Sequence, residues 1–169
     1  MIPGFRVSVA LLAAALPGLS RAEPAPPTLD PVVVTGSRVE HSSFDLPVSV
    51  DVVDATRIGA DNARVNASEA LAAVPGITVL NRQNYAQDLQ ISSRGFGARS
   101  AFGVRGIRLV SDGIPASMPD GQGQAATFNL DRAERIEVMR GPLSAIYGNS
   151  AGGVIQLFSR EGGDPPTVE

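Results

Sequence analysis

The chain has 169 residues, of which 43% are hydrophobic and 18% charged, enough for one globular domain with a core mainly of Val, Ile, Leu and Ala. It contains no cysteine, which excludes disulfides, thiolate nucleophiles and cysteine-based zinc sites. The formal net charge is −3, and an acidic balance argues against nucleic acid as a partner, because phosphate binding requires a basic face.

The first 22 residues have the layout of a secretory signal peptide. A cationic start with Arg6 precedes a largely apolar run over 7–16, a Pro17-Gly18 break and the small-residue pattern Ser20-x-Ala22. The run is too short to cross about 30 Å of hydrocarbon, which disfavours a transmembrane helix. We therefore predict cleavage after Ala22 and export of the remaining chain.

Residues 23–44 form a Pro-rich arm that we expect to be extended and flexible without a partner. Within it, "DPVVVTGSR" places three consecutive valines between Pro31 and Gly36. Such a β-branched island can add a strand to the sheet edge of another protein, or it can be the first strand of the domain's own sheet. The residues alone leave both possibilities open.

From residue 45 the composition becomes that of a globular domain, and its first elements follow in order. The stretch "PVSVDVVD" alternates as a strand over 47–54. In "NASEALAAVPGITVL", Asn66 can cap a helix with Glu69 three residues later, and Pro75-Gly76 end it before a strand. Another strand is expected in "DLQISSRGFG".

The second half of the domain is expected to hold a hairpin, a long loop and a strand–helix–strand unit. Asp112-Gly113 predicts a hairpin-type turn, and "MPDGQGQAATFNL" predicts a glycine-rich loop. In "ERIEVMRGPLSAIYGNSAGGVIQLFSR", an edge-like strand ends at Gly141 and a short helix ends near Gly148. A last strand is predicted over 154–158.

No constellation of residues indicates an enzyme. His41 is the only histidine and has no second ligand or base to pair with. The segment "RGFGARSAFGVRG" lacks the third glycine of a dinucleotide-binding turn and the Lys-Ser/Thr ending of a P-loop. The carboxylates are scattered along the chain. We therefore expect no catalytic residues, no cofactor and no metal.

Five motifs in order resemble the N-terminal part of TonB-dependent outer-membrane receptors: "DPVVVTGSR", "ALAAVPGITV", "ISSRGFG", "VSDGIP" and "RAERIEVMRGPLSAIYGNSAGGVI". The resemblance spans residues 30 to 160. It implies an α+β plug domain over 45–160, with a small mixed four-stranded sheet, short helices and long loops, lodged in a 22-stranded barrel. Residues 161–169 would be the tail where that barrel begins.

The resemblance also assigns roles to individual residues. The TonB box would be residues 30–35, and this assignment favours strand addition to the coupling protein TonB; its members are Asp30, Pro31, Val32, Val33, Val34 and Thr35. Arg94 and Arg140 would pair with acidic side chains of the inner barrel wall, so that the partner of Arg140 would lie outside these residues.

Three apical loops, over 81–88, 97–103 and 115–124, would face a ferric siderophore or a similar nutrient. Their candidate ligand-binding residues are Arg82, Gln83, Asn84, Tyr85, Arg99, Met118, Gln122 and Gln124. A barrel of 22 strands needs on the order of 220 residues in strands alone. We therefore expect a fragment or truncated form of an outer-membrane receptor, or alternatively a free periplasmic binding module that acts without a barrel.

Overall fold

The structure is a computed structural model, and all of its described residues belong to one unit, Pro31–Glu169. The described ranges are 33–34, 41–42, 48–60, 62–81, 88–101, 103–141, 144–148 and 150–162. The predicted signal peptide and most of the predicted TonB box lie outside them.

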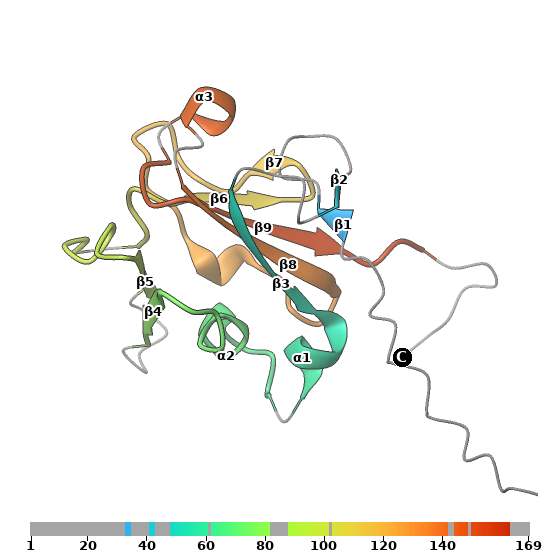
Figure 1. Cartoon of the computed structure of the whole chain (residues 1–169). Coiled ribbons are helices and arrows are strands. Elements are labelled where there is room, and N and C mark those ends of the chain that lie inside the picture. The colour runs from blue at the N-terminus through green and yellow to red at the C-terminus, as the bar shows by residue number, and fades with distance from the viewer. Residues whose placement is uncertain are drawn as a thin grey trace, which may run out of the picture. The chain divides into compact units, whose positions relative to one another are not determined.

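A five-stranded mixed sheet forms the centre of the domain, in the order β3-β8-β9-β6-β7 (Figure 1). Its strands are β3 (Ser49–Asp54), β8 (Ala133–Arg140), β9 (Val154–Ser159), β6 (Arg108–Ser111) and β7 (Ile114–Pro115). All neighbours are antiparallel except β6 and β9, which are parallel. The predicted α+β class is confirmed.

The sheet has one strand more than the four expected, because the chain reverses directly after β6 and adds the two-residue strand β7. Asp112 and Gly113 at this reversal have φ values of 47° and 78°. Positive φ at both central residues is the backbone of a type I′ turn, which matches the twist of the strands that it joins. The hairpin predicted at Asp112-Gly113 is therefore confirmed.

Short helices and a second hairpin complete the domain. The helices are α1 (Ala55–Gly59), α2 (Ala67–Leu71), α3 (Ser144–Tyr147) and the 3-10 helix η1 (Ala125–Thr127). The strands β4 (Ile77–Leu80) and β5 (Gln90–Ser93) pair antiparallel outside the main sheet. Among the described residues, no helix has the length and apolar character to cross a membrane.

Local signals account for where α2 begins. The Glu69 carboxylate accepts a hydrogen bond of 3.2 Å from the backbone N–H of Asn66 and one of 2.8 Å from that of Arg64. Free N–H groups at a helix start are stabilised by such a carboxylate. The predicted start at Asn66 is confirmed.

The two valines of the predicted TonB box that the structure describes lie in β1 (Val33–Val34). This strand pairs antiparallel with β2 (His41–Ser42), and the pair forms a sheet of its own. Val33 and Val34 are therefore not part of the five-stranded sheet.

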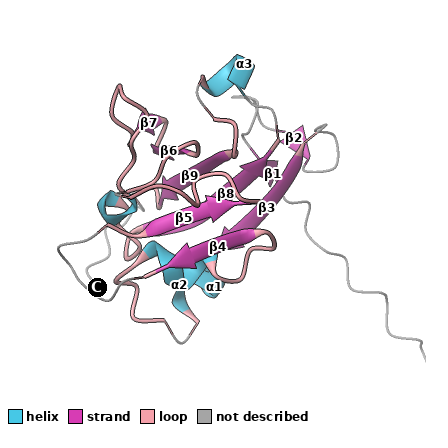
Figure 2. Ribbon diagram, turned by 90° about the vertical axis from the view of Figure 1, so that its left-hand side faces the viewer, coloured by secondary structure: helices cyan, strands magenta, loops and turns pink. Residues whose placement is uncertain are grey.

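The two faces of the main sheet are covered differently (Figure 1, Figure 2). The first face carries the larger apolar core, in which β8 and β9 pack with α1 and α2. The second face carries a smaller cluster, Val110, Met139 and Val154, against which Tyr147 of α3 packs. In both views α3 lies away from α1 and α2.

The strand β8 is an interior strand, not the edge-like strand that its alternation of charged and apolar residues suggested. It pairs with β3 on one side and with β9 on the other, and residues 136–139 are all buried. Glu137 is compatible with this position because Arg135 neutralises it from the same strand, with 3.0 Å between Nε and the carboxylate.

Gly153 lies where the chain enters β9 and cannot carry a side chain. Its φ is +117°, and a Cβ there would overlap the backbone carbonyl oxygen of Met139 on β8. Glycine is required both by the backbone conformation and by the close approach of the two strands.

We predict that Gly153→Ala lowers the free energy of unfolding of the chain by about 2 kcal/mol or more, because backbone strain and overlap add. Urea denaturation followed by circular dichroism measures the change. Gly162→Ala is the matched control, since a Cβ at Gly162 meets nothing within 4 Å. Equal midpoints for the two variants would contradict the prediction.

Candidate functional site

Arg140, the last residue of β8, is paired within the chain. Its Nη2 donates to the Asp51 carboxylate and to the Ser49 hydroxyl, the latter at 2.9 Å, and its Nη1 donates to the Pro75 carbonyl. The side chain is only 9% exposed. The expectation that the partner of Arg140 lies outside these residues is thus wrong.

The strand register explains this pairing. Ser49 is the direct cross-strand partner of Arg140, so Asp51, two residues along β3, projects from the same face within reach of a long side chain. Pro75 belongs to the turn between α2 and β4. One guanidinium therefore joins β3, β8 and this turn.

The Nε atom of Arg140 is buried and has no hydrogen-bond partner among the described residues. Buried polar atoms normally have a hydrogen-bond partner, so this N–H is an exception. The two other nitrogen atoms of the guanidinium both donate hydrogen bonds.

Arg94 lies next to Arg140, across Gly76. A Cβ on Gly76 would come within 3.4 Å of Arg140 Nη1 and 3.7 Å of Arg94 Cγ. The backbone N–H of Arg94 donates to the Gly76 carbonyl at 3.1 Å, and its φ of 48° is left-handed. The two arginines singled out from the sequence are therefore brought together.

The environments of the two guanidinium groups differ. Arg94 is exposed, and no carboxylate among the described residues lies within ion-pairing distance of it. Arg140 is instead committed to Asp51. The site consists of the exposed guanidinium of Arg94 beside the turn at Pro75 and Gly76. This guanidinium can bind a carboxylate or another anion.

The predicted apical loops are tied to one another. Val104 and Gly123 exchange backbone hydrogen bonds of 2.8 and 2.7 Å, which joins the chain just after loop 97–103 to the loop over 115–124. Gln124 Nε2 donates to Asp88 at 3.3 Å, which ties in the end of the loop over 81–88. Arg105 and Asp120 add an exposed ion pair of 3.5 Å.

The candidate ligand-binding residues have different roles in this arrangement. Gln122 accepts from Arg105 at 3.4 Å, and Gln124 contacts Asp88, so both hold the loops together. Arg99 is exposed, and Met118 is 55% exposed, which leaves them free for a ligand. Arg82, Gln83, Asn84 and Tyr85 lie outside the described residues.

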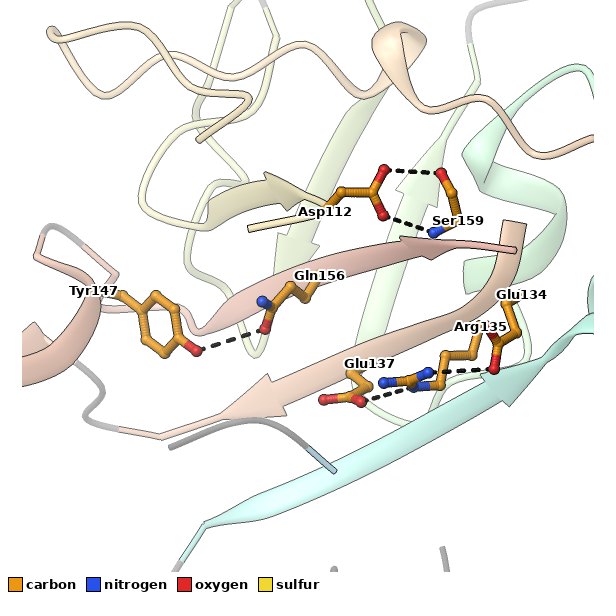
Figure 3. Close-up of polar contacts among 7 residues, drawn as sticks. All are labelled: Asp112, Glu134, Arg135, Glu137, Tyr147, Gln156 and Ser159. Carbon is orange, nitrogen blue, oxygen red and sulfur yellow. Dashed lines mark hydrogen bonds and ion pairs between the residues drawn. The ribbon is translucent and has the colours of Figure 1, made fainter. Parts of the chain in front are cut away.

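A second set of polar residues lies on the opposite face of the sheet (Figure 3). Arg135 contacts the fully buried Glu137 and also Glu134, at 3.4 Å, and its guanidinium stands 4.1 Å from the centre of the Phe158 ring. Together these contacts neutralise a charge that would otherwise be costly to bury.

Two further contacts in this set join separate elements of the fold (Figure 3). The Tyr147 hydroxyl on α3 donates to Gln156 on β9 at 3.5 Å. The Asp112 carboxylate accepts from the backbone N–H of Ser159 at 2.7 Å and from its hydroxyl at 2.8 Å. Sequence reasoning missed this set; a glutamate between Ile136 and Val138 was its one local signal.

Within the described part of the chain, no three His, Cys, Asp or Glu side chains are grouped so that they could hold a metal ion.

Comparison with known proteins gives one consistent result. Residues 42–154 match the family model described as the TonB-dependent receptor plug domain. The chain is 30% identical over 136 residues to a hemin receptor of Yersinia enterocolitica, an alignment that covers 80% of this chain and 19% of the relative. It is 34% identical over 143 residues to an iron-regulated outer membrane virulence protein of Vibrio cholerae, with 83% and 21% covered.

Solved structures agree with these matches. A mutant ferric enterobactin receptor of Pseudomonas aeruginosa superimposes with a TM-score of 0.56 at 25% identity, covering 78% of this chain and 19% of that one. The siderophore receptor PirA of Acinetobacter baumannii shares the fold, with a TM-score of 0.52 at 24% identity over 68% of this chain and 17% of its own. The chain thus spans about a fifth of the length of the curated relatives that it matches.

We predict that Arg140→Ala destabilises the chain by about 1–3 kcal/mol, because it leaves the half-buried Asp51 carboxylate and the Pro75 carbonyl without their donor. Thermal and urea unfolding measure the loss. Arg94→Ala is the control: it removes an exposed charge at the same turn, and we expect a change within about 0.5 kcal/mol. If both substitutions had the same small effect, Arg140 would not be the internal tie described above.

Proposed function

Because the chain belongs to the family of TonB-dependent receptor plug domains, we propose that it binds ligand and gates the lumen of an outer-membrane receptor. The nutrient would be a ferric siderophore, hemin or a similar iron complex, as the names of its relatives suggest. The observation that carries this proposal is the joining of the three loops through Val104–Gly123 and Gln124–Asp88.

The loops supply a preformed ligand surface. Since Gln122 and Gln124 are used to fix the loops, the ligand would contact Arg99 and Met118, which are free, and residues of the loop over 82–87. An exposed arginine suits an anionic iron complex, because a guanidinium forms charge-assisted hydrogen bonds with carboxylate oxygens. Restricting the loops in advance lowers the entropy cost of binding.

Arg94 would hold the domain in the lumen of the barrel. It is exposed and carries no counter-charge among the described residues, so an acidic side chain of the inner wall can reach it. Arg140 fixes the turn at Pro75, and the next residue of this turn, Gly76, accepts the backbone N–H of Arg94. Of the two predicted wall-facing arginines, Arg94 makes the contact and Arg140 positions it.

Energy would come from the inner membrane through TonB. The segment 30–35 would add a strand to the sheet of TonB, and a pull on it would displace part of the plug and admit the ligand. The sheet of the domain does not use Val33 or Val34, so this strand can be drawn away without opening the five-stranded core.

The location of the native protein tests the proposal. We expect it in the outer-membrane fraction, in a heat-modifiable complex with the barrel. Recovery of the native product in the soluble periplasmic fraction would instead support a free binding module.

We predict that Val33→Pro abolishes binding to TonB, because proline removes a donor from the strand that would be added. Calorimetric titration with the periplasmic domain of TonB measures this. Val33→Thr, which keeps a β-branched residue and the N–H, should retain binding. Both variants should melt like the parent chain, since β1 lies outside the main sheet. TonB binding by the proline variant would refute the assignment of the TonB box.

A further inference from the structure

The second face of the sheet carries an open groove of about 940 Å³ between β6, β8, β9 and α3. Its lining includes Arg108, Val110, Pro115, Ile146, Tyr147 and Gln156. Figure 3 shows where Tyr147 and Gln156 meet. The register places Arg108 beside Val154, at the end of the groove away from Ser159.

Arg108 is a positive charge in this groove that has no counter-charge among the described residues. It is half-buried, and no described carboxylate lies within ion-pairing distance of its guanidinium. Arg135 is neutralised by Glu134 and Glu137, and Asp112 is bonded to Ser159. Glu161 is exposed at the opposite end, beyond Ser159.

The surroundings of Arg108 favour a carboxylate embedded in an apolar segment. Val110 is buried, Tyr147 is half-buried, and Ile146 remains 42% exposed. A guanidinium beside apolar walls is screened little by water, so a single carboxylate there gains more than it would on an open surface. A segment with aliphatic side chains flanking an acidic one fits both features.

We propose that this groove is a second docking surface for the inner wall of the barrel, and that an acidic wall residue flanked by apolar ones pairs with Arg108. This inference rests on the proposed function. The relatives are about four times as long as this chain, so most of such a receptor lies outside it. Arg94 and Arg140 lie at the opposite face of the sheet, and the plug is thereby held from both faces.

The test is site-specific photo-crosslinking in the outer membranes of the cells that make the protein. A photoreactive amino acid replaces Ile146 in the groove, Phe96 beside the Arg94 site, or Val65 in the loop between α1 and α2, side chains that are 42%, 51% and 56% exposed. Mass spectrometry identifies the captured peptide. We expect Ile146 to capture a barrel peptide that contains an Asp or Glu, and Val65 not to capture that peptide.

Arg108→Gln should lower the yield of the Ile146 adduct about tenfold, the effect of losing one hydrogen-bonded charge pair. Arg57→Gln, an exposed arginine on α1, should leave the yield unchanged. Both variants should keep the melting temperature of the parent, which separates a lost contact from a lost fold.

The outcomes separate the two proposals. Suppose that Phe96 captures a barrel peptide and Ile146 does not, because it captures TonB, a second copy of the chain or nothing at all. The groove is then not a docking surface for the barrel, and the proposed function stands. If neither position captures a barrel peptide, the proposed function fails and this inference fails with it. An Ile146 adduct whose yield does not respond to Arg108→Gln overturns the role of Arg108.

Discussion

The guanidinium of Arg140 connects three segments that are far apart in the sequence. Through Asp51 and Ser49 it fixes β3 to β8, and through the Pro75 carbonyl it fixes the turn after α2 to both strands. The position of Gly76, and with it the exposed Arg94, depends on that turn. A buried cation therefore organises the surface on which the second cation is presented.

The strand that carries Arg140, β8, also contains a buried charge with a partner inside the chain. A strand paired on both sides with both faces covered would ordinarily be apolar throughout, and β8 instead contains a glutamate with no exposed side-chain area. Arg135 neutralises Glu137 and is itself held over the ring of Phe158. Burial of the pair is tolerable because the partner is two residues away, so no long-range ordering is required to bring the charges together.

Features fixed by a few adjacent residues could be predicted from the sequence. The turn at Asp112-Gly113 and the start of α2 at Asn66 depend on local backbone preferences and local hydrogen bonds. The α+β class came from the resemblance carried by the five motifs. The motifs identified the family, which the family model and the relatives support. The sequence singled out Arg94 and Arg140 separately, as wall-facing residues, and gave no view of Gly76 between them.

Features that depend on tertiary pairing could not be predicted. The partner of Arg140 is 89 residues away on another strand, and its choice depends on a register that the sequence does not specify. The burial of Glu137 depends on β3 and β9 flanking β8, and alternation alone suggested an edge. Gln122 and Gln124 resembled ligand-binding amides, but their amides are used between loops. The two-residue strand β7 was too short to distinguish from a turn.

The place of β9 has a consequence for how the chain folds. It is the last described strand in sequence, yet it stands third in the sheet, between β8 and β6, and its pairing with β6 is parallel. Until β9 is in place, β8 and β6 have no common neighbour, and each exposes an edge open to pairing with other chains. Parallel pairing of distant strands is also slow, because a long loop must close first. The central sheet therefore forms only when nearly the whole described domain is available, and the edges of β6 and β8 stay open to other chains until β9 pairs with both.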